Sequence, residues 1–438
     1  MHRCPSVRKD LYAVALAAAL FATAVVLGHV LQERDGTLRL GWPPLYANWL
    51  PHVGPGTPAA LAVAALVIAY GPAVARRLGP RALAWASFGA SLAWVLSLAL
   101  VDGWHRGVAA RLTTKYEYLR SVPEVTDVWH TLREFTGRIL MDSPDNWPAH
   151  VAGHPPGALL TFVWLDRIGL SGGAWAGVFC VVAASSAAAA AVVTVRALAG
   201  ADLARRAAPF LVLAPAAVWL GTSADGYFTG VSAWAVALLA LAATGRARRP
   251  WLAALGSGLL FGWTLYLSYG LTLMALIGVA VLVAARTARP LPWVLLGVAP
   301  VVAAFTLAGF WWLEGYLTLH ERYYQGAAGV RPYAYYVWGN LAAQVVSVGV
   351  AGVAGVRRAA ARARRPSPLV LLVAGAVLAM AVADLSGMSK AETERIWLPF
   401  ALWVLPAAAL LPRACHRWWL GAQAAVALAV NHLLLTGW

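Results

Sequence analysis

The chain has 438 residues, of which 61% are hydrophobic and only 12% are charged, and its mean hydropathy is +0.67. This composition excludes an ordinary soluble globular protein. The net charge of +16 would suit nucleic-acid binding, but the basic residues are placed in a pattern that predicts a different role for them.

Several apolar segments are long enough to cross a bilayer. A spanning helix needs about 20 apolar residues, and its backbone must be helical because no water satisfies its polar groups. We therefore predict an all-α fold, a polytopic transmembrane helical bundle of about 12–14 spans in the plasma membrane. In chain order, the clearest segments are Leu11–Leu31, Ala59–Val74, Ala82–Val101, Ala174–Leu198, Leu291–Leu313 and Leu369–Leu385.

The basic residues concentrate in short links between these segments. Such links hold 21 of the 34 Lys and Arg residues and only two acids, Asp10 and Asp202. Short cytoplasmic links are rich in Lys and Arg, and this bias orients the chain. It predicts a cytoplasmic N-terminus, carboxylates on the extracytoplasmic side, and no nucleic-acid partner. The clusters are Arg3/Arg8/Lys9, Arg76/Arg77/Arg81, Arg196/Arg205/Arg206, Arg246/Arg248/Arg249, Arg286/Arg289, Arg357/Arg358/Arg362/Arg364/Arg365 and Arg413/Arg417.

The longest polar stretch is predicted to be a large extracytoplasmic loop at 102–154. The rest of the chain divides into N-terminal spans at 1–101, a transmembrane core at 155–356, and C-terminal spans at 357–438. The last of these regions contains a second external loop at 386–395.

The apolar segment Pro155–Leu170, directly after the long loop, is only about 16 residues long and is short for a crossing. Both of its neighbours are predicted to lie outside. We therefore expect a half-inserted or re-entrant helix, or two strongly tilted pieces, next to a cavity.

Two carboxylates of the loop are candidates for a catalytic base. Asp102 follows the third span, and a partly desolvated carboxylate beside basic side chains can take a proton from a hydroxyl. An ordinary polar cap at the end of a span would have the same sequence. Glu117 lies between two tyrosines, a pattern typical of sugar recognition and equally of an interfacial aromatic belt.

Two further candidates lie near the predicted helix starts. His154 directly precedes Pro155-Pro156-Gly157, where proline suits the first turn of a helix, so the prolines need no functional explanation. The histidine before them should face the loop. Asp225 lies in a short external tip between two short spans, where it could serve function or simply form an Asp-Gly turn.

Later external segments carry candidates for binding a lipid phosphate or a sugar. Lys and Arg at the outer surface can hold a phosphate, Arg through a bidentate fork, and nearby glutamates can orient them. Charged residues at span ends also simply extend to the interface. The candidates are His320, Arg322, Lys390, Glu392, Glu394 and Arg395.

Three of these elements follow one another as in a known class of enzymes. Asp102, His154-Pro155-Pro156 and Asp225 resemble the loop acid, the His/Lys-Pro-Pro motif and the later Asp of GT-C class multi-pass glycosyltransferases. The block Ser389-Lys390…Glu394-Arg395-Ile396-Trp397-Leu398-Pro399-Phe400 is similar to uncharacterised actinobacterial integral membrane proteins. Two spans precede the one that leads into the loop, and no Asp-Asp or Asp-Glu pair begins it. The base is therefore open between Asp102 and Glu117.

The resemblance implies a GT-C-like fold and an enzyme that moves a sugar from a polyprenyl-phosphate donor. The acceptor would be a glycan, lipid or protein of the cell envelope, outside the membrane. No cofactor is required and no metal site is predicted, although a divalent cation could bind through Asp102 and Asp225.

Two other classes stay open. Ionisable groups within a membrane often mark a transport path, which would suit a lipid or small-molecule transporter or flippase. Transporters commonly contain internal repeats, and none is visible in this sequence. A non-catalytic membrane scaffold, whose loop only binds protein, is the third class.

Overall fold

The computed structural model describes residues 7–437 and contains a bundle of long helices. Within that range eight helices are long and apolar enough to cross a membrane, and two bent helix pairs raise the maximum to ten. The chain is a multi-pass helical membrane protein, as predicted, but the predicted 12–14 spans are too many. The eight helices are α1 (Arg8–Asp35), α2 (Thr57–Arg77), α3 (Pro80–Ala99), α7 (Gly173–Ala199), α10 (Ala224–Ala243), α11 (Pro250–Leu267), α15 (Tyr333–Ala360) and α16 (Pro368–Leu385).

Two candidate spans are bent. The first pair is α13 (Leu291–Leu307) with α14 (Trp312–Gln325), which meet at 71°. The second pair, bent by 113°, joins residues 398–410 to residues 413–433. It contains the short helix α18 (Leu398–Ala401) and the long helix α19 (His416–Leu433).

The span count is lower than predicted because several apolar segments form helices too short to cross. The apolar stretch before Gly221 breaks near Pro215 into α8 (Ala201–Val212) and α9 (Ala217–Leu220). Helix α6 (Pro156–Arg167) has 12 residues. At 1.5 Å per residue that is about 18 Å, against a hydrocarbon core of about 30 Å. The segment after the polar stretch is therefore one short helix, α6, rather than two tilted pieces. Helix α12 (Met274–Ala285) continues a 3-10 turn, and the two together form the shorter apolar helix Tyr269–Ala285.

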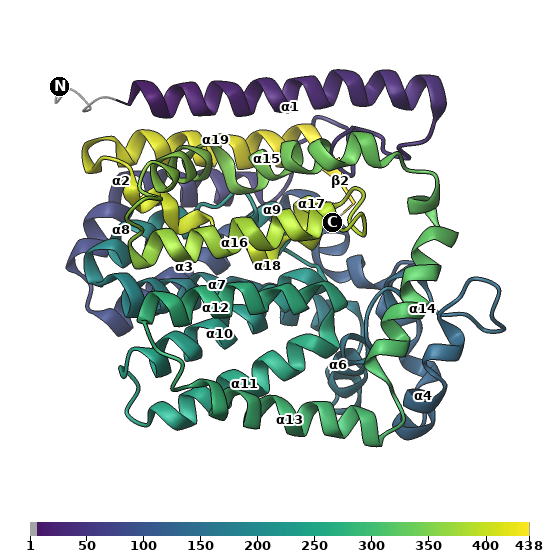
Figure 1. Ribbon diagram of the computed structural model, residues 1–438. Coiled ribbons are helices and arrows are strands. Elements are labelled where there is room, and N and C mark those ends of the chain that lie inside the picture. Colours follow the sequence, from purple (N-terminus) through teal and green to yellow (C-terminus); the bar gives the residue numbers. More distant parts are fainter. Residues whose placement is uncertain (1–6, 438) are drawn as a thin grey trace.

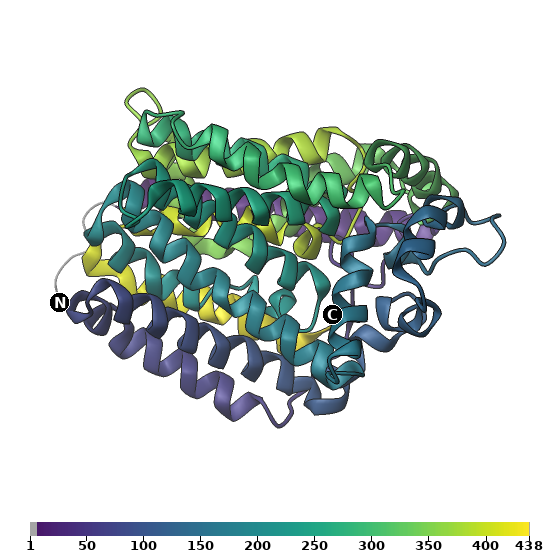
Figure 2. The ribbon, with the colours of Figure 1, turned by 90° about the horizontal axis from the view of Figure 1, so that it is seen from below.

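Figures 1 and 2 show the long helices side by side, with several short elements gathered at one end of the bundle. That end holds α4 (Val128–Glu134), α6, α14 and α17 (Thr393–Ile396), and we call it the polar end. The start of α1 lies at the opposite end, with the Arg-rich links between α2 and α3, α7 and α8, and α15 and α16. We call this the basic end.

Ion pairs and hydrogen bonds join separate links at the basic end. The carboxylate of Asp10 in α1 is fully buried and pairs with Arg357 and Arg358 at the end of α15, with Arg358 Nη2 at 2.6 Å. Arg246, after α10, donates to the backbone carbonyl of Arg196 in α7 at 3.1 Å. The basic links and the carboxylate-rich segment 102–154 therefore lie at opposite ends of the bundle.

Residues 102–154 form a folded cap rather than the large loop that was predicted. The segment consists of short helices and turns, including α4 and α5 (Ala149–Ala152). Trp147 is 1% exposed, and its Nε1 donates to the carbonyl of Phe135 at 3.0 Å. Phe135 in turn meets the ring of Phe310 edge-on, with 5.6 Å between ring centres. The aromatic residues of this polar stretch are thus buried against the bundle, which the composition of the segment did not reveal.

A small sheet departs from the predicted all-α fold. Strand β1 (Ala47–Trp49) pairs antiparallel with β2 (Leu434–Thr436), so the segment after α1 meets the C-terminal residues. Arg106 and Arg111 of the cap donate to the backbone carbonyls of Thr436 and Gly437, at 3.4 and 2.9 Å.

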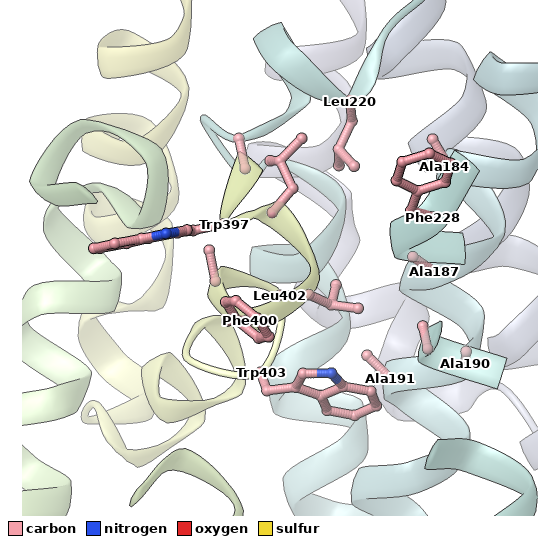
Figure 3. Packing of buried hydrophobic residues seen from close by; sticks show 14 of the residues in the cluster. Ala184, Ala187, Ala190, Ala191, Leu220, Phe228, Trp397, Phe400, Leu402 and Trp403 are labelled. Atoms are coloured by element: carbon pink, nitrogen blue, oxygen red, sulfur yellow. The ribbon is translucent and has the colours of Figure 1, made fainter. Parts of the chain in front are cut away.

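The core beside the polar end is built on small residues of α7. Figure 3 shows Leu402 and Trp403, which follow α17 and α18, facing the alanines of α7 near Ala191. Small side chains let helices approach closely in a membrane. A Cβ on Gly230 of α10 would lie 2.2 Å from the carbonyl oxygen of Ala183, which shows how closely α7 and α10 pack. This packing fixes the start of α10 beside α17.

Candidate active site

A buried ion pair joins α10 to α17 at the polar end. Arg395 of α17 pairs with Asp225 of α10, and the two side chains are 6% and 5% exposed. Arg395 Nη2 also lies 3.0 Å from Oε2 of Glu392, whose other oxygen is 3.9 Å from Nη1 of Arg331. Burial lowers the pKa of Arg395, but Asp225 and Glu392 more than offset this and hold the pKa above its ordinary value. The guanidinium is therefore permanently charged and fixed between two carboxylates.

The local sequence explains why Asp225 points into the protein. Ser223 caps α10, its Oγ accepting the backbone N–H of Gly226 at 3.0 Å, so the helix begins at Ala224. Asp225 is then in the first turn, where the helix dipole favours a negative charge. The predicted loop tip at 221–227 is thus mostly helix, because the cap starts α10 earlier than the Asp-Gly pair suggested.

A second pair of ionisable groups comes from the cap. Glu117 is 3% exposed, and its Oε1 lies 2.8 Å from Nδ1 of His150. The second oxygen of Glu117 is buried with no hydrogen-bond partner among the described residues. Burial lowers the pKa of His150, but Glu117 more than offsets this effect, so the pKa is raised. The two side chains form a carboxylate–histidine dyad.

His154 is held in one tautomer by its surroundings. Its Nδ1 is 2.7 Å from the backbone carbonyl of His150 and 2.9 Å from the hydroxyl of Tyr118. A carbonyl only accepts, so Nδ1 carries the proton and Nε2 is an acceptor in the neutral ring. Burial lowers the pKa of His154 to about 4, against the attraction of Asp225, so the ring is neutral at pH 7.

The two groups of residues form one cluster. The charge of Glu117 contributes to the raised pKa of Arg395, and that of Asp225 acts on His154, so each group lies within electrostatic reach of the other. The ring of His154 is 5.6 Å from that of Phe228, one turn after Asp225. His150 and Glu392, at 18% and 23% side-chain exposure, are partly accessible. We call this the buried charge cluster, and its members are Glu117, His150, His154, Asp225, Glu392 and Arg395.

A cavity of about 760 Å³ opens close to the cluster, between α4, α6, α11 and α13. Trp164 and Trp263 line it, with ring centres 5.4 Å apart. Tyr227, two residues after Asp225, accepts the Nε1–H of Trp263 at 2.8 Å. The cavity is therefore one residue layer away from the start of α10.

Glu394 lies beside the cluster but faces another way. Its Oε1 accepts the backbone N–H of Tyr46 at 2.8 Å, and its Oε2 has no hydrogen-bond partner among the described residues. Burial raises the pKa of Glu394 to about 7. The side chain thus ties the segment before β1 to α17.

Asp102 lies in a different ion cluster. Its carboxylate contacts His52 Nε2 at 2.9 Å, Arg106 Nε at 3.2 Å and Arg111 Nη2 at 2.9 Å. The two arginines also hold the C-terminal backbone, so this cluster joins the end of α3, the cap and the chain end. The charge of Glu117 also acts on Arg111, so Arg111 lies within electrostatic reach of both clusters.

The remaining predicted residues lie outside the buried charge cluster. The ammonium group of Lys390 donates to the carbonyl of Ala328 at 2.9 Å and lies over the ring of Tyr324. His320 and Arg322 belong to α14, where the His320 ring contacts that of Tyr324 at 5.2 Å.

The sequence analysis missed two members of the site region, His150 and Arg331. His150 precedes His154 by four residues, a spacing that places both on one side of a helical turn, and this signal was available. Arg331 had no such signal, because its partners Leu38, Glu392 and Lys390 are distant in sequence.

No group of three or more His, Cys, Asp or Glu side chains within residues 7–437 is arranged to hold a metal ion. Asp102 and Asp225, which were considered together as cation ligands, belong to separate ion clusters.

Together, the fold and the site define a multi-pass helical membrane protein with ionisable groups buried at one end of its bundle. No family model matches the chain, and no curated protein matches it significantly. Among solved structures it is similar to the oligosaccharyltransferase of Archaeoglobus fulgidus in complex with zinc and sulfate, at 14% sequence identity and a TM-score of 0.40. The match covers 74% of this chain and 47% of that chain, so the chain spans about half the length of that protein. A TM-score this low does not establish a common fold.

Proposed function

We propose that the chain is a membrane glycosyltransferase that moves a sugar from a polyprenyl-phosphate donor to an acceptor of the cell envelope. The observation that carries the proposal is the buried charge cluster, which sets a carboxylate–histidine dyad beside a fixed guanidinium. The motif order Asp102, His154-Pro155-Pro156 and Asp225, which resembles the GT-C class, supports the same assignment.

The proposed site faces the extracytoplasmic side of the plasma membrane. Short Arg-rich links stay in the cytoplasm, and they lie at the basic end with the start of α1. The cluster is at the other end, so it would meet donor and acceptor outside.

In this proposal Glu117 is the base, rather than Asp102. One oxygen of Glu117 is oriented by His150 and the other lacks a partner, so it can accept a hydrogen bond from an acceptor hydroxyl. Both oxygens of Asp102 already contact basic groups.

The reaction is a displacement at the anomeric carbon. The acceptor oxygen forms the new bond to that carbon while its proton passes to Glu117, and the bond between the carbon and the phosphate oxygen breaks. The polyprenyl phosphate leaves with the electron pair. Arg395, held by two carboxylates, and Arg331, held by backbone carbonyls and Glu392, would stabilise the growing negative charge. Nε2 of His154 would accept a hydrogen bond from a sugar hydroxyl, because it carries no proton at neutral pH.

The test is transfer by the purified protein in lipid, with radiolabelled polyprenyl-phosphate hexoses and pentoses and a panel of acceptors. Loss of a general base lowers turnover roughly 10²–10⁴-fold, and we expect this for Glu117→Gln. Arg395→Lys should also lower turnover, because a point charge does not replace the fork held between two carboxylates. Asp102→Asn should retain activity if the protein stays folded.

The matched control is Glu134→Gln, which changes a half-exposed glutamate of the same cap. It should leave turnover unchanged. Wild-type turnover in Glu117→Gln would remove Glu117 as the base. An inactive wild type across the whole panel would favour transport or a scaffold role.

A further inference from the structure

A long apolar groove lies on the lipid side of the bundle, between α3, α7 and α10. Its volume is about 910 Å³, and side chains of α7 line it at every turn from Trp175 to Arg196. Those 22 residues of helix rise about 32 Å, the full thickness of a hydrocarbon core. Trp85 and Val182, both exposed, form part of its open side. A lipid chain is the kind of molecule that covers such a surface.

The groove ends at two arginines at the basic end. Arg81 begins α3 and Arg196 lies in the last turn of α7, and both line the cavity. Neither guanidinium has an ion pair or hydrogen bond within residues 7–437, and no acidic residue lines the groove.

Several other arginines of this end have protein acceptors: Arg205 donates to the carbonyl of Leu78 at 3.1 Å, Arg246 to that of Arg196, and Arg358 pairs with Asp10. Arg76 and Arg77, like Arg81 and Arg196, have no ion pair or hydrogen bond from their guanidinium groups within residues 7–437, but they lie outside the groove. Arg81 and Arg196 are the two positive charges that line it, placed where an apolar groove meets the membrane surface.

We propose that this groove is a binding site for a phospholipid with an anionic headgroup. The phosphate lies between Arg81 and Arg196, where guanidinium groups bind phosphate through paired N–H donors. An acyl chain follows α7 past Val193 and Ala189, and its apolar contact adds affinity that a soluble phosphate cannot obtain. Basic pockets between spans at the cytoplasmic side are a known way to hold anionic lipid headgroups.

A lipid in this place would join α3, α7 and α10. Because it binds the folded state, it would raise the unfolding temperature with its concentration. The proposed headgroup site is independent of the proposed enzymatic function, since Arg81 and Arg196 lie at the end of the bundle opposite the buried charge cluster.

The experiment compares lipids of identical acyl chains on the purified protein in detergent. Native mass spectrometry counts retained lipid, and thermal unfolding follows titration with phosphatidylglycerol, phosphatidylcholine or inorganic phosphate. We expect retention and stabilisation with phosphatidylglycerol, weaker effects with phosphatidylcholine, and none with phosphate. The double variant Arg81→Gln/Arg196→Gln should bind phosphatidylglycerol roughly 30-fold more weakly, from about 1 kcal/mol per arginine near a surface.

Two further variants separate a built site from general attraction to the surface. Arg76→Gln/Arg77→Gln removes the same charge from exposed positions outside the groove and should change binding little. Ala84→Trp keeps both groove arginines but fills the groove one turn along α3, and it should weaken binding. Equal losses in the two double variants, or equal stabilisation by inorganic phosphate and phosphatidylglycerol, would overturn the proposal.

Discussion

Replacing Arg395 by Gln should destabilise the protein more than any change to an exposed ion pair. The substitution leaves Asp225, 5% exposed, as a buried carboxylate without its cation, while Glu392 keeps Arg331 nearby. Removing one partner of a buried ion pair typically destabilises a protein by about 3–5 kcal/mol. We expect Arg395→Gln to lower the free energy of unfolding by that amount.

The double variant Asp225→Asn/Arg395→Gln tests the cause of this loss. It buries two neutral amides, so it should recover a large part of the stability, and the two single changes should be strongly non-additive. The free energy of unfolding is measured in mixed micelles as the denaturing detergent is increased. Arg413→Gln, which breaks the exposed Arg413–Asp202 pair, is the control and should change stability by about 0–1 kcal/mol. A loss for Arg395→Gln no larger than that of the control, or additive single losses, would refute the reasoning.

Three further predictions address other parts of the molecule. Asp102→Asn should loosen the C-terminal strand, because the two arginine partners of Asp102 also hold that strand. Amide hydrogens of β2 should then exchange faster, as expected if the free energy of local opening falls by about 1–3 kcal/mol. Burial raises the pKa of Glu394 from 4.5 to about 7, so the contribution of Glu394 to stability falls as pH rises between these two values. Burial lowers the pKa of His154 from 6.5 to about 4, so the contribution of His154 to stability rises with pH between these two values. Between about pH 4 and about pH 8, the unfolding temperature should therefore rise more steeply with pH in Glu394→Gln than in the wild type. In His154→Gln it should fall with pH over the same range. Profiles of both variants that run parallel to that of the wild type would contradict both assignments. Gly230→Ala places a Cβ against the α7 backbone and should destabilise the bundle by several kcal/mol, whereas Gly89→Ala meets open space and should be neutral or stabilising in the same unfolding assay.

The sequence predicted the class of fold well, because hydropathy over some 20 residues is a local property. It overestimated the number of spans, since apolar composition alone does not show that Pro215 separates α8 from α9. It also predicted a large loop at 102–154, where the structure has a folded cap. The buried contact of Trp147 and Phe135 with Phe310 is a tertiary property that no local pattern contains.

The candidate site was predicted only in part, because local patterns show single residues and not their partners distant in the sequence. Glu117, His154, Asp225 and Arg395 each have a local signal, and the structure brings them together. Asp102 had an equally good signal, but its carboxylate contacts His52, 50 residues earlier, and arginines bound to the chain end. Whether a carboxylate is free to react depends on such distant partners, so the sequence could not separate Asp102 from Glu117.

Helix α1 has a consequence for how the protein is made. Only 11% of its most apolar stretch is buried, it packs mainly on α15, and its Asp10 pairs with Arg357, 347 residues later in the chain. At about 5–20 residues per second, a ribosome needs about 20–70 s to reach that partner. Strand β1 waits longer still, since its partner strand β2 follows it by 385 to 389 residues. Helix α1 must therefore stay in the bilayer without its main partner during much of synthesis, held by its own apolar surface, and it docks when α15 arrives.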